Sequence, residues 1–423
     1  MQQALTRRSA MTAAIASLEA LGGGSARAQQ AATAFPAPKS PLTLRVVDVA
    51  GDLQISQPAL ENFAKQHPEL VRRFAFTQAT APELAAKLKA QQDAGRTDID
   101  LVLTGNDALA AGMAQNVWLE ILPAYASHFP ALDQLYLPGA YAMQKMARGQ
   151  AFVLDWYPSG PLLEYDPARV KDVPSSAEEL LAWCKAHPNR FMYARPANSG
   201  PGRTFVMGLP YLLGDKDPLE PLNGWDRTWA YLKEIGQYIE YYPSGTTATM
   251  KELGEGSRDI IATTTGWDIN PRYLGIVPEQ FKIGTLKGFH WVGDANYVAV
   301  PKGVSQETLG VVLSLIAYLL QPGQQAYMYD HGYMYPGPAI KGVTLDMAPK
   351  ESQEVIARFG RPEYAALIAD NPVEPPLDDA PPSPRRPRRV PPPHAGPRAQ
   401  LPARPATRRC RPEQARRWGS RAE

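Results

Sequence analysis

Residues that could hold a small polar molecule gather at predicted turns and strand ends. A ligand cleft needs aromatic faces for contact area and a few polar groups that fix the orientation of the ligand. The candidate ligand-binding residues are Asn106, Asp107, Trp156, Tyr157, Ser199, Tyr242, Thr246, Trp267, Asp268, Trp291, Asp294 and Asn296. For each of them, the alternative is an ordinary role as a core ring, a turn former or a helix cap.

The aromatic and acidic members of this set favour a cationic ligand. Trp267 and Trp291 would offer ring faces to a positive charge. Asp268 and Asp294 would neutralise that charge. The set therefore predicts an organic cation or a similar small polar solute as the ligand.

Two polar segments keep an anionic ligand open as an alternative. Residues 199–203 and 244–247 both precede predicted helices. Free backbone N–H groups at the start of a helix favour negative charge. Residues 1–380 carry a net charge of −8, which argues slightly against attraction of anions.

No motif in the chain indicates catalysis. The sequence contains no G-x-S-x-G, no H-E-x-x-H and no G-x-x-x-x-G-K-[ST]. The six histidines are scattered without metal-ligand spacing. Cys184 lies in an amphipathic stretch, so we expect it to be a small core residue. We therefore expect no catalytic residues, no metal and no cofactor. A secreted enzyme that uses Cys184 is the competing function.

The middle of the chain alternates predicted strands with predicted helices. Strands are expected at residues 42–50, 73–77 and 98–104, and helices at 58–67 and 82–93. This rhythm indicates an α/β fold with mainly parallel sheets. Ligands of such sheets bind outside the carboxyl ends of the strands, where the turn at residues 104–107 lies.

The two ends of the chain differ in composition from the middle. A paired arginine, an apolar run and Ala26-Arg27-Ala28 indicate an export signal over residues 1–28, of a twin-arginine-like or general type. Residues 381–423 are rich in Pro and Arg, with twelve arginines against two glutamates. Their charge of +10 within a chain of +2 leaves residues 1–380 at −8. This tail is expected to be disordered and to bind no nucleic acid.

Several segments, in chain order, resemble the extracellular solute-binding proteins of bacterial ABC importers. They are residues 98–102, residues 174–181, residues 253–256 with Gly266-Trp267, and residues 301–304 followed by an apolar helix and residues 321–326. The resemblance covers about residues 42–375. It is greatest to the polyamine, thiamine and iron(III) binding class.

This resemblance implies a two-lobed, type II periplasmic-binding-protein fold. Lobe 1 would comprise residues 42–155 and about 285–340, and lobe 2 residues 156–284 and about 341–375. The protein would be a periplasmic monomer without a membrane span, and would deliver one small solute to an ABC permease and, through it, an ATPase. The pair Tyr241-Tyr242 resembles the paired tyrosines of iron(III)-binding members, so iron(III) is an alternative ligand. An oxyanion is a further alternative, because of the two polar segments that precede predicted helices.

Overall fold

A computed structural model describes residues 35–49 and 51–377 of the chain. The predicted export signal at residues 1–28 and the predicted tail at 381–423 lie outside the described residues. Within this part of the chain, no helix is long and apolar enough to cross a membrane.

The larger sheet forms the centre of lobe 1. Its strands follow the order β10-β4-β9-β3-β1-β2, and β11 pairs with β9. β1 pairs in parallel with β2 and with β3. The helices between these strands return the chain to the end of the sheet where each strand starts, so the strands run in the same direction. The strand bounds are β1 Leu42–Asp48, β2 Val71–Gln78, β3 Leu101–Gly105, β4 Ala151–Gly160, β9 Trp291–Ala299, β10 Gly337–Pro338 and β11 Val373–Glu374.

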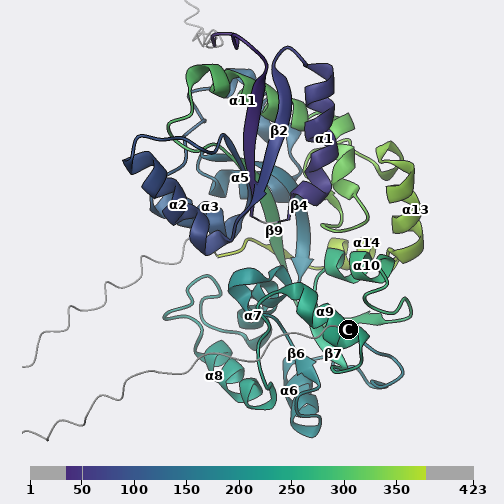
Figure 1. The fold of residues 1–423 in the computed structure, drawn as a ribbon. Coiled ribbons are helices and arrows are strands. Elements are labelled where there is room, and N and C mark those ends of the chain that lie inside the picture. The colour runs from purple at the N-terminus through teal and green to yellow at the C-terminus, as the bar shows by residue number, and fades with distance from the viewer. Residues whose placement is uncertain (1–34, 50, 378–423) are drawn as a thin grey trace, which may run out of the picture. The chain divides into compact units, whose positions relative to one another are not determined.

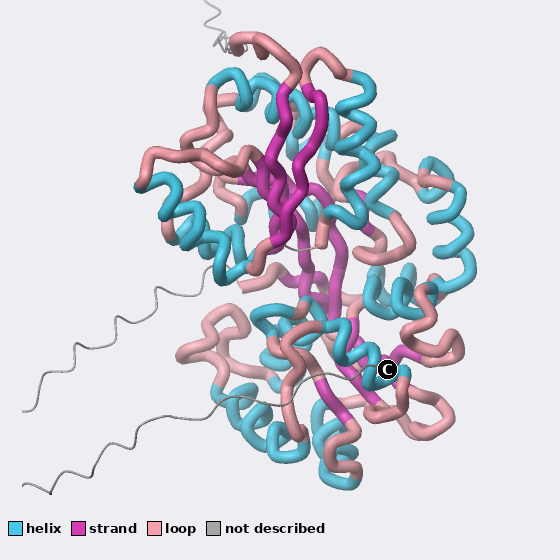
Figure 2. Tube along the Cα trace, in the orientation of Figure 1, coloured by secondary structure: helices cyan, strands magenta, loops and turns pink. Residues whose placement is uncertain are grey.

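Helices pack around the strands of this sheet, as Figures 1 and 2 show. In α1, the buried residues Ile55, Ala59, Leu60 and Phe63 recur at helical spacing and form one apolar face. The helix bounds are α1 Leu53–Gln66, α2 Ala81–Asp93, α3 Asn106–Ala114, α4 Leu132–Leu135, α5 Pro138–Met146, α11 Gln306–Leu319 and α12 Pro322–Gln325. The two C-terminal helices, α13 Lys350–Phe359 and α14 Glu363–Asp370, pack elsewhere, as described below.

Lobe 2 has a four-stranded sheet in the order β6-β7-β5-β8. Ser176 caps the start of α6 through its hydroxyl, which accepts from the Glu179 N–H, as the spacing of these residues predicts. The strands are β5 Leu162–Tyr165, β6 Phe191–Met192, β7 Ile260–Thr263 and β8 Lys282–Gly284, and the helices are α6 Ala177–Ala186, α7 Gly200–Leu213, α8 Asp226–Ile235, α9 Thr246–Gly254 and α10 Thr265–Tyr273.

Both sheets are mixed, whereas the sequence predicted mainly parallel ones. β4 carries the chain from lobe 1 to lobe 2 and β9 brings it back, so the two strands run antiparallel to each other (Figure 1). β9 is also antiparallel to β3, and in lobe 2 β5 is antiparallel to β7 and β8. The periodicity of single elements does not reveal strand direction when the partner lies far away in the sequence.

The apolar cores show how the chain divides between the lobes. One core draws on residues from 44 to 157 and from 295 to 340. Two others use residues between 163 and 286. A fourth joins Ile269 of α10 and Trp291 of β9 to Val355, Phe359 and Tyr364. The C-terminal helices thus pack on lobe 2, while β11 joins the sheet of lobe 1.

Asp268 holds these C-terminal helices against α10. Its carboxylate is fully buried and is bound by Arg272 at 3.0 Å, by Arg361 at 2.5 Å and by the Tyr364 hydroxyl at 2.7 Å. A buried carboxylate with two guanidinium partners is a structural ion pair whose disruption leaves unpaired buried charge. Asp268 therefore acts within the core.

Asp268→Asn should destabilise the protein by about 3–5 kcal/mol, because Arg272 and Arg361 would lose their buried counter-charge. Urea unfolding of both proteins measures this difference. Glu279→Gln is the matched control, since Glu279 pairs with Arg358 at the exposed surface and its loss should change stability far less. Equal effects of the two substitutions would contradict the structural role of Asp268.

Candidate functional site

A cavity of about 670 Å³ lies between the two lobes. Lobe 1 contributes the segments that follow three parallel strands: Val49 and Gly51 after β1, Ala79–Ala81 after β2, and Gly105 at the end of β3. These are carboxyl ends of parallel strands, where α/β sheets bind ligands. We refer to this cavity as the cleft.

Lobe 2 lines the cleft with the starts of three helices. Ser199 and Gly200 belong to the start of α7, Thr246 to the start of α9 and Trp267 to the first turn of α10. The hydroxyls of Ser199 and Thr246 lie 2.8 Å apart and join the first two helix starts. The lobe 2 wall is thus made of helix N-termini.

Six of the predicted ligand-binding residues line this cleft. They are Asp107, Tyr157, Ser199, Thr246, Trp267 and Asn296. They come from both lobes and from the crossover strands β4 and β9, so residues far apart in the sequence meet at one cavity. These six remain our candidates for direct contact with a ligand.

Trp267 has its position set by a close backbone approach. The preceding Gly266 lies so close to segment 332–333 that a Cβ there would meet the Tyr333 carbonyl oxygen at 1.9 Å. Trp267 itself packs edge-on against the Tyr333 ring, with the centroids 5.5 Å apart. Both rings line the cleft and together form an aromatic corner.

Arg203 connects the two lobes across the cleft. Its guanidinium donates to Asp107 of α3 and to Asp294 of β9, each at 2.5 Å. Burial in the cleft raises the pKa of Asp107, and the charge of Arg203 opposes that shift. Arg203 was not among the predicted site residues. An arginine in the first turn of a helix, where the dipole disfavours a cation, is the signal that could have indicated carboxylate partners.

Asn106 and Asp294 hold this arginine without lining the cavity. The Asn106 amide donates to Asp294 at 2.6 Å and its carbonyl accepts from the Tyr297 hydroxyl at 2.8 Å. Asp294 is 3% exposed. Both residues therefore position Arg203, and neither lines the cleft.

Three other predicted residues lie away from the cleft. Trp291, expected at a turn, begins β9; it is fully buried and donates its indole N–H to the Leu367 carbonyl. Trp156 packs against the core of lobe 1 and leaves room only for a glycine at position 139. Asp268 belongs to the buried ion pairs described above. None of the three lines the cleft, because the core takes up their apolar and charged groups.

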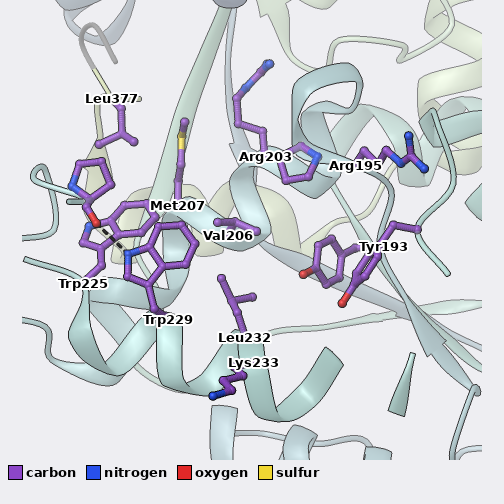
Figure 3. A pocket seen from close by; sticks show the side chains of 13 residues that line it. Tyr193, Arg195, Arg203, Val206, Met207, Trp225, Trp229, Leu232, Lys233 and Leu377 are labelled. Atoms are coloured by element: carbon purple, nitrogen blue, oxygen red, sulfur yellow. Dashed lines mark hydrogen bonds between the residues drawn. The ribbon is translucent and has the colours of Figure 1, made fainter. Parts of the chain in front are cut away.

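Tyr242 lines a different cavity, of about 710 Å³, within lobe 2 (Figure 3). In Figure 3, Trp225 and Trp229 lie on one side of this cavity and Tyr193 on the other. Tyr242 packs against Tyr193 with centroids 5.0 Å apart. Its neighbour Tyr241 is exposed and donates to Glu252. The tyrosine pair therefore does not line the cleft.

Three buried carboxylates lie behind the lobe 1 wall. Asp48 accepts from the backbone N–H groups of Gly51 and Asp52, each at 3.0 Å. By contrast, neither oxygen of Asp52 and only one oxygen of Asp155 has a hydrogen-bond partner among the described residues. The partner of Asp155 is the amide of Asn296, at 3.3 Å, which lines the cleft.

Burial without partners favours the protonated form of these acids. It raises the pKa of Asp52 well above its ordinary value, and the charges of Asp155, Asp48 and Asp294 add to that effect. Burial also raises the pKa of Asp155 to about 8, against the hydrogen bond from Asn296. Sequence analysis missed both residues, although an aspartate inside the apolar run 151–157 is a signal of unusual burial.

The described residues hold no group of three or more His, Cys, Asp or Glu side chains that could bind a metal ion. Cys184 is buried in a core of lobe 2, and burial raises the pKa of its thiol to about 12. A thiol in such surroundings is a poor nucleophile, because the thiolate is the reactive form.

Residues 59–357, more than half of the chain, match the family model of the bacterial extracellular solute-binding protein. The chain belongs to this family. No curated protein matches it significantly by sequence. The family match and the two lobes confirm the resemblance found in the sequence, and the fold is that of type II periplasmic binding proteins.

Solved structures of ABC transporter proteins are similar to this one. An ABC transporter protein from Clostridium perfringens has a TM-score of 0.58 at 13% identity, over 78% of this chain and 93% of its own. The spermidine/putrescine substrate-binding protein of Streptococcus pneumoniae has a TM-score of 0.53 at 15% identity, over 75% and 89%. A periplasmic thiamin binding protein has a TM-score of 0.52 at 15% identity, over 75% of this chain and 89% of its own.

Asp155→Asn should flatten the pH dependence of stability. Between the unfolded pKa of ~3.9 and the folded value of about 8, the folded protein holds a proton that the unfolded chain has lost. The free energy of unfolding therefore falls as pH rises through this window, by up to ~1.4 kcal/mol per pH unit. Urea unfolding between pH 5 and pH 8 should show a smaller slope for the variant.

Glu279→Gln is the control for this experiment. The hydrogen bond from Arg358 lowers the pKa of Glu279, so the group is ionised throughout that window in both states. Its substitution should leave the slope of the wild type unchanged. If Asp155→Asn has the same slope as the wild type, Asp155 does not hold a proton in the folded protein over this pH range.

Proposed function

We propose that this protein captures a small solute with a positively charged group in the cleft and delivers it to an ABC permease and its ATPase. The family supplies the general function, and the cleft supplies the ligand class. The observation that carries this class is the set of acids at the lobe 1 wall: Asp107 lines the cleft, and Asp48, Asp52 and Asp155 lie behind it.

The charges around the cleft favour a cation over an anion. Arg203 is already shared by Asp107 and Asp294. The nearby carboxylates of Asp52 and Asp155 have no basic partner among the described residues, and burial raises the pKa of both groups. A bound cation would favour the ionised form of these acids, and Trp267 and Tyr333 could present their rings to it.

Other ligands and activities have less support. An iron(III) site on Tyr241 and Tyr242 would need both phenolates at the cleft, and they lie elsewhere. An enzyme relying on Cys184 would need an accessible thiolate, whereas the thiol is buried. Export to the periplasm, a monomeric state and binding without turnover complete the proposal.

Trp267→Ala should weaken binding of the cationic solute by about two- to thirty-fold, the range of a cation–π contact of ~0.5–2 kcal/mol. A thermal-shift screen of the full chain against thiamine, polyamines, amino acids, oxyanions and ferric complexes identifies the solute. A ligand at a hundred times its Kd should stabilise the fold by about 2.7 kcal/mol.

Trp225→Phe is a control, because Trp225 lines the other cavity and should leave affinity unchanged. If no cationic member shifts the melting temperature of folded, ligand-free protein, the proposed ligand class is wrong. If oxyanions alone shift it, the cleft binds anions.

A further inference from the structure

The two walls of the cleft differ in charge. The polar side chains that lobe 2 contributes are the amide of Asn198, the hydroxyls of Ser199, Ser244, Thr246 and Thr247, and the guanidinium of Arg203. No carboxylate from lobe 2 lines the cleft among the described residues. Lobe 1 contributes Asp107 directly and three further aspartates behind its wall.

The helix starts of the two walls differ in the same way. In lobe 1, the start of α1 is covered by the Asp48 carboxylate, and the first turns of α2 and α3 contain Glu83 and Asp107. In lobe 2, the first turn of α10 contains Asp268, whose charge is taken up by Arg272 and Arg361. Neither α7 nor α9 has an acid in its first turn, and α9 has no side-chain cap. The partial positive charge of α9 is thus uncompensated at the cleft.

Acids without partners lie at the opposite wall. Asp52 follows the cleft-lining Gly51, is fully buried and has both carboxylate oxygens unpaired among the described residues. Asp155 lies behind Asn296 with one unpaired oxygen. Arg203 is already shared by two carboxylates, so the positive character of lobe 2 beyond it comes from backbone N–H groups and hydroxyls.

We propose that the solute is a zwitterion, with its ammonium group facing the aspartates of lobe 1 and its carboxylate facing the first turns of α7 and α9. This deepens the proposed function and rests on it: the positive group is the one inferred above, and the anionic group is new. Recognition of both ends would need both lobes, so such a ligand would join them.

The first test compares probes that carry two charges or one. Titration calorimetry of the full chain would use ω-amino acids from glycine to 6-aminohexanoate, and then the amine and the carboxylic acid that match the best of them. We expect the two-charge probe to bind about ten- to a hundred-fold tighter than either single-charge analogue, because each loses one charge-assisted set of hydrogen bonds.

A matched pair of variants tests which wall binds the carboxylate. Thr247 at the start of α9 and Thr80 at the start of α2 are both exposed and both line the cleft, from opposite lobes. An aspartate near a helix start is compatible with the fold. Thr247→Asp should weaken the two-charge probe at least ten-fold and leave the amine analogue no weaker. Thr80→Asp should leave the two-charge probe no weaker.

Three results would overturn the inference. If the amine alone binds as tightly as the two-charge probe, the solute is a simple cation and the proposed function survives. If Thr80→Asp weakens the two-charge probe as much as Thr247→Asp does, the cleft does not have the assigned polarity. If no amine or amino acid binds to folded, ligand-free protein, both the zwitterion and the proposed cationic class are wrong.

Discussion

The arrangement of the cleft depends on the guanidinium of Arg203. Arg203 belongs to α7 in lobe 2, and its guanidinium binds Asp107 on α3 and Asp294 on β9. One side chain therefore connects lobe 2 to lobe 1 and to a crossover strand. Asn106 and Tyr297 extend this contact into lobe 1. The pair with Asp107 lies at the cleft itself.

The buried carboxylates of this protein differ in whether they have hydrogen-bonding partners. Asp268 has two guanidinium partners and a hydroxyl, and it joins α10 to the C-terminal helices. Asp52 and Asp155, by contrast, are buried behind the cleft with unpaired oxygens. An unpaired buried acid is costly to ionise, so it is poorly suited to hold a fold together. Near a binding site, a cationic ligand can favour the ionised form of such an acid and so be bound by it.

Sequence analysis predicted the family and the two-lobed fold, because residues such as Gly266-Trp267 and the segment 301–304 occur in a characteristic order. It also placed Asp107, Ser199 and Thr246 at helix starts and Trp267 at a turn, and the structure brings all four to the cleft. Trp291 and Asp268 lie in the core instead, and ring size and charge do not tell whether a core partner exists far along the chain. Arg203 and Asp155 were missed for the same reason: their partners lie on distant elements.

In the proposed function, one solute is held between the lobes. Electron spin resonance distance measurement between labels at Glu83 on α2 and Lys251 on α9 tests it directly, in a chain whose native Cys184 and Cys410 are replaced by serine. The full chain would be measured alone and saturated with its tightest-binding amine or amino acid. The account predicts a shorter and narrower distance distribution with the solute bound. An unchanged distribution at proven saturation would contradict it.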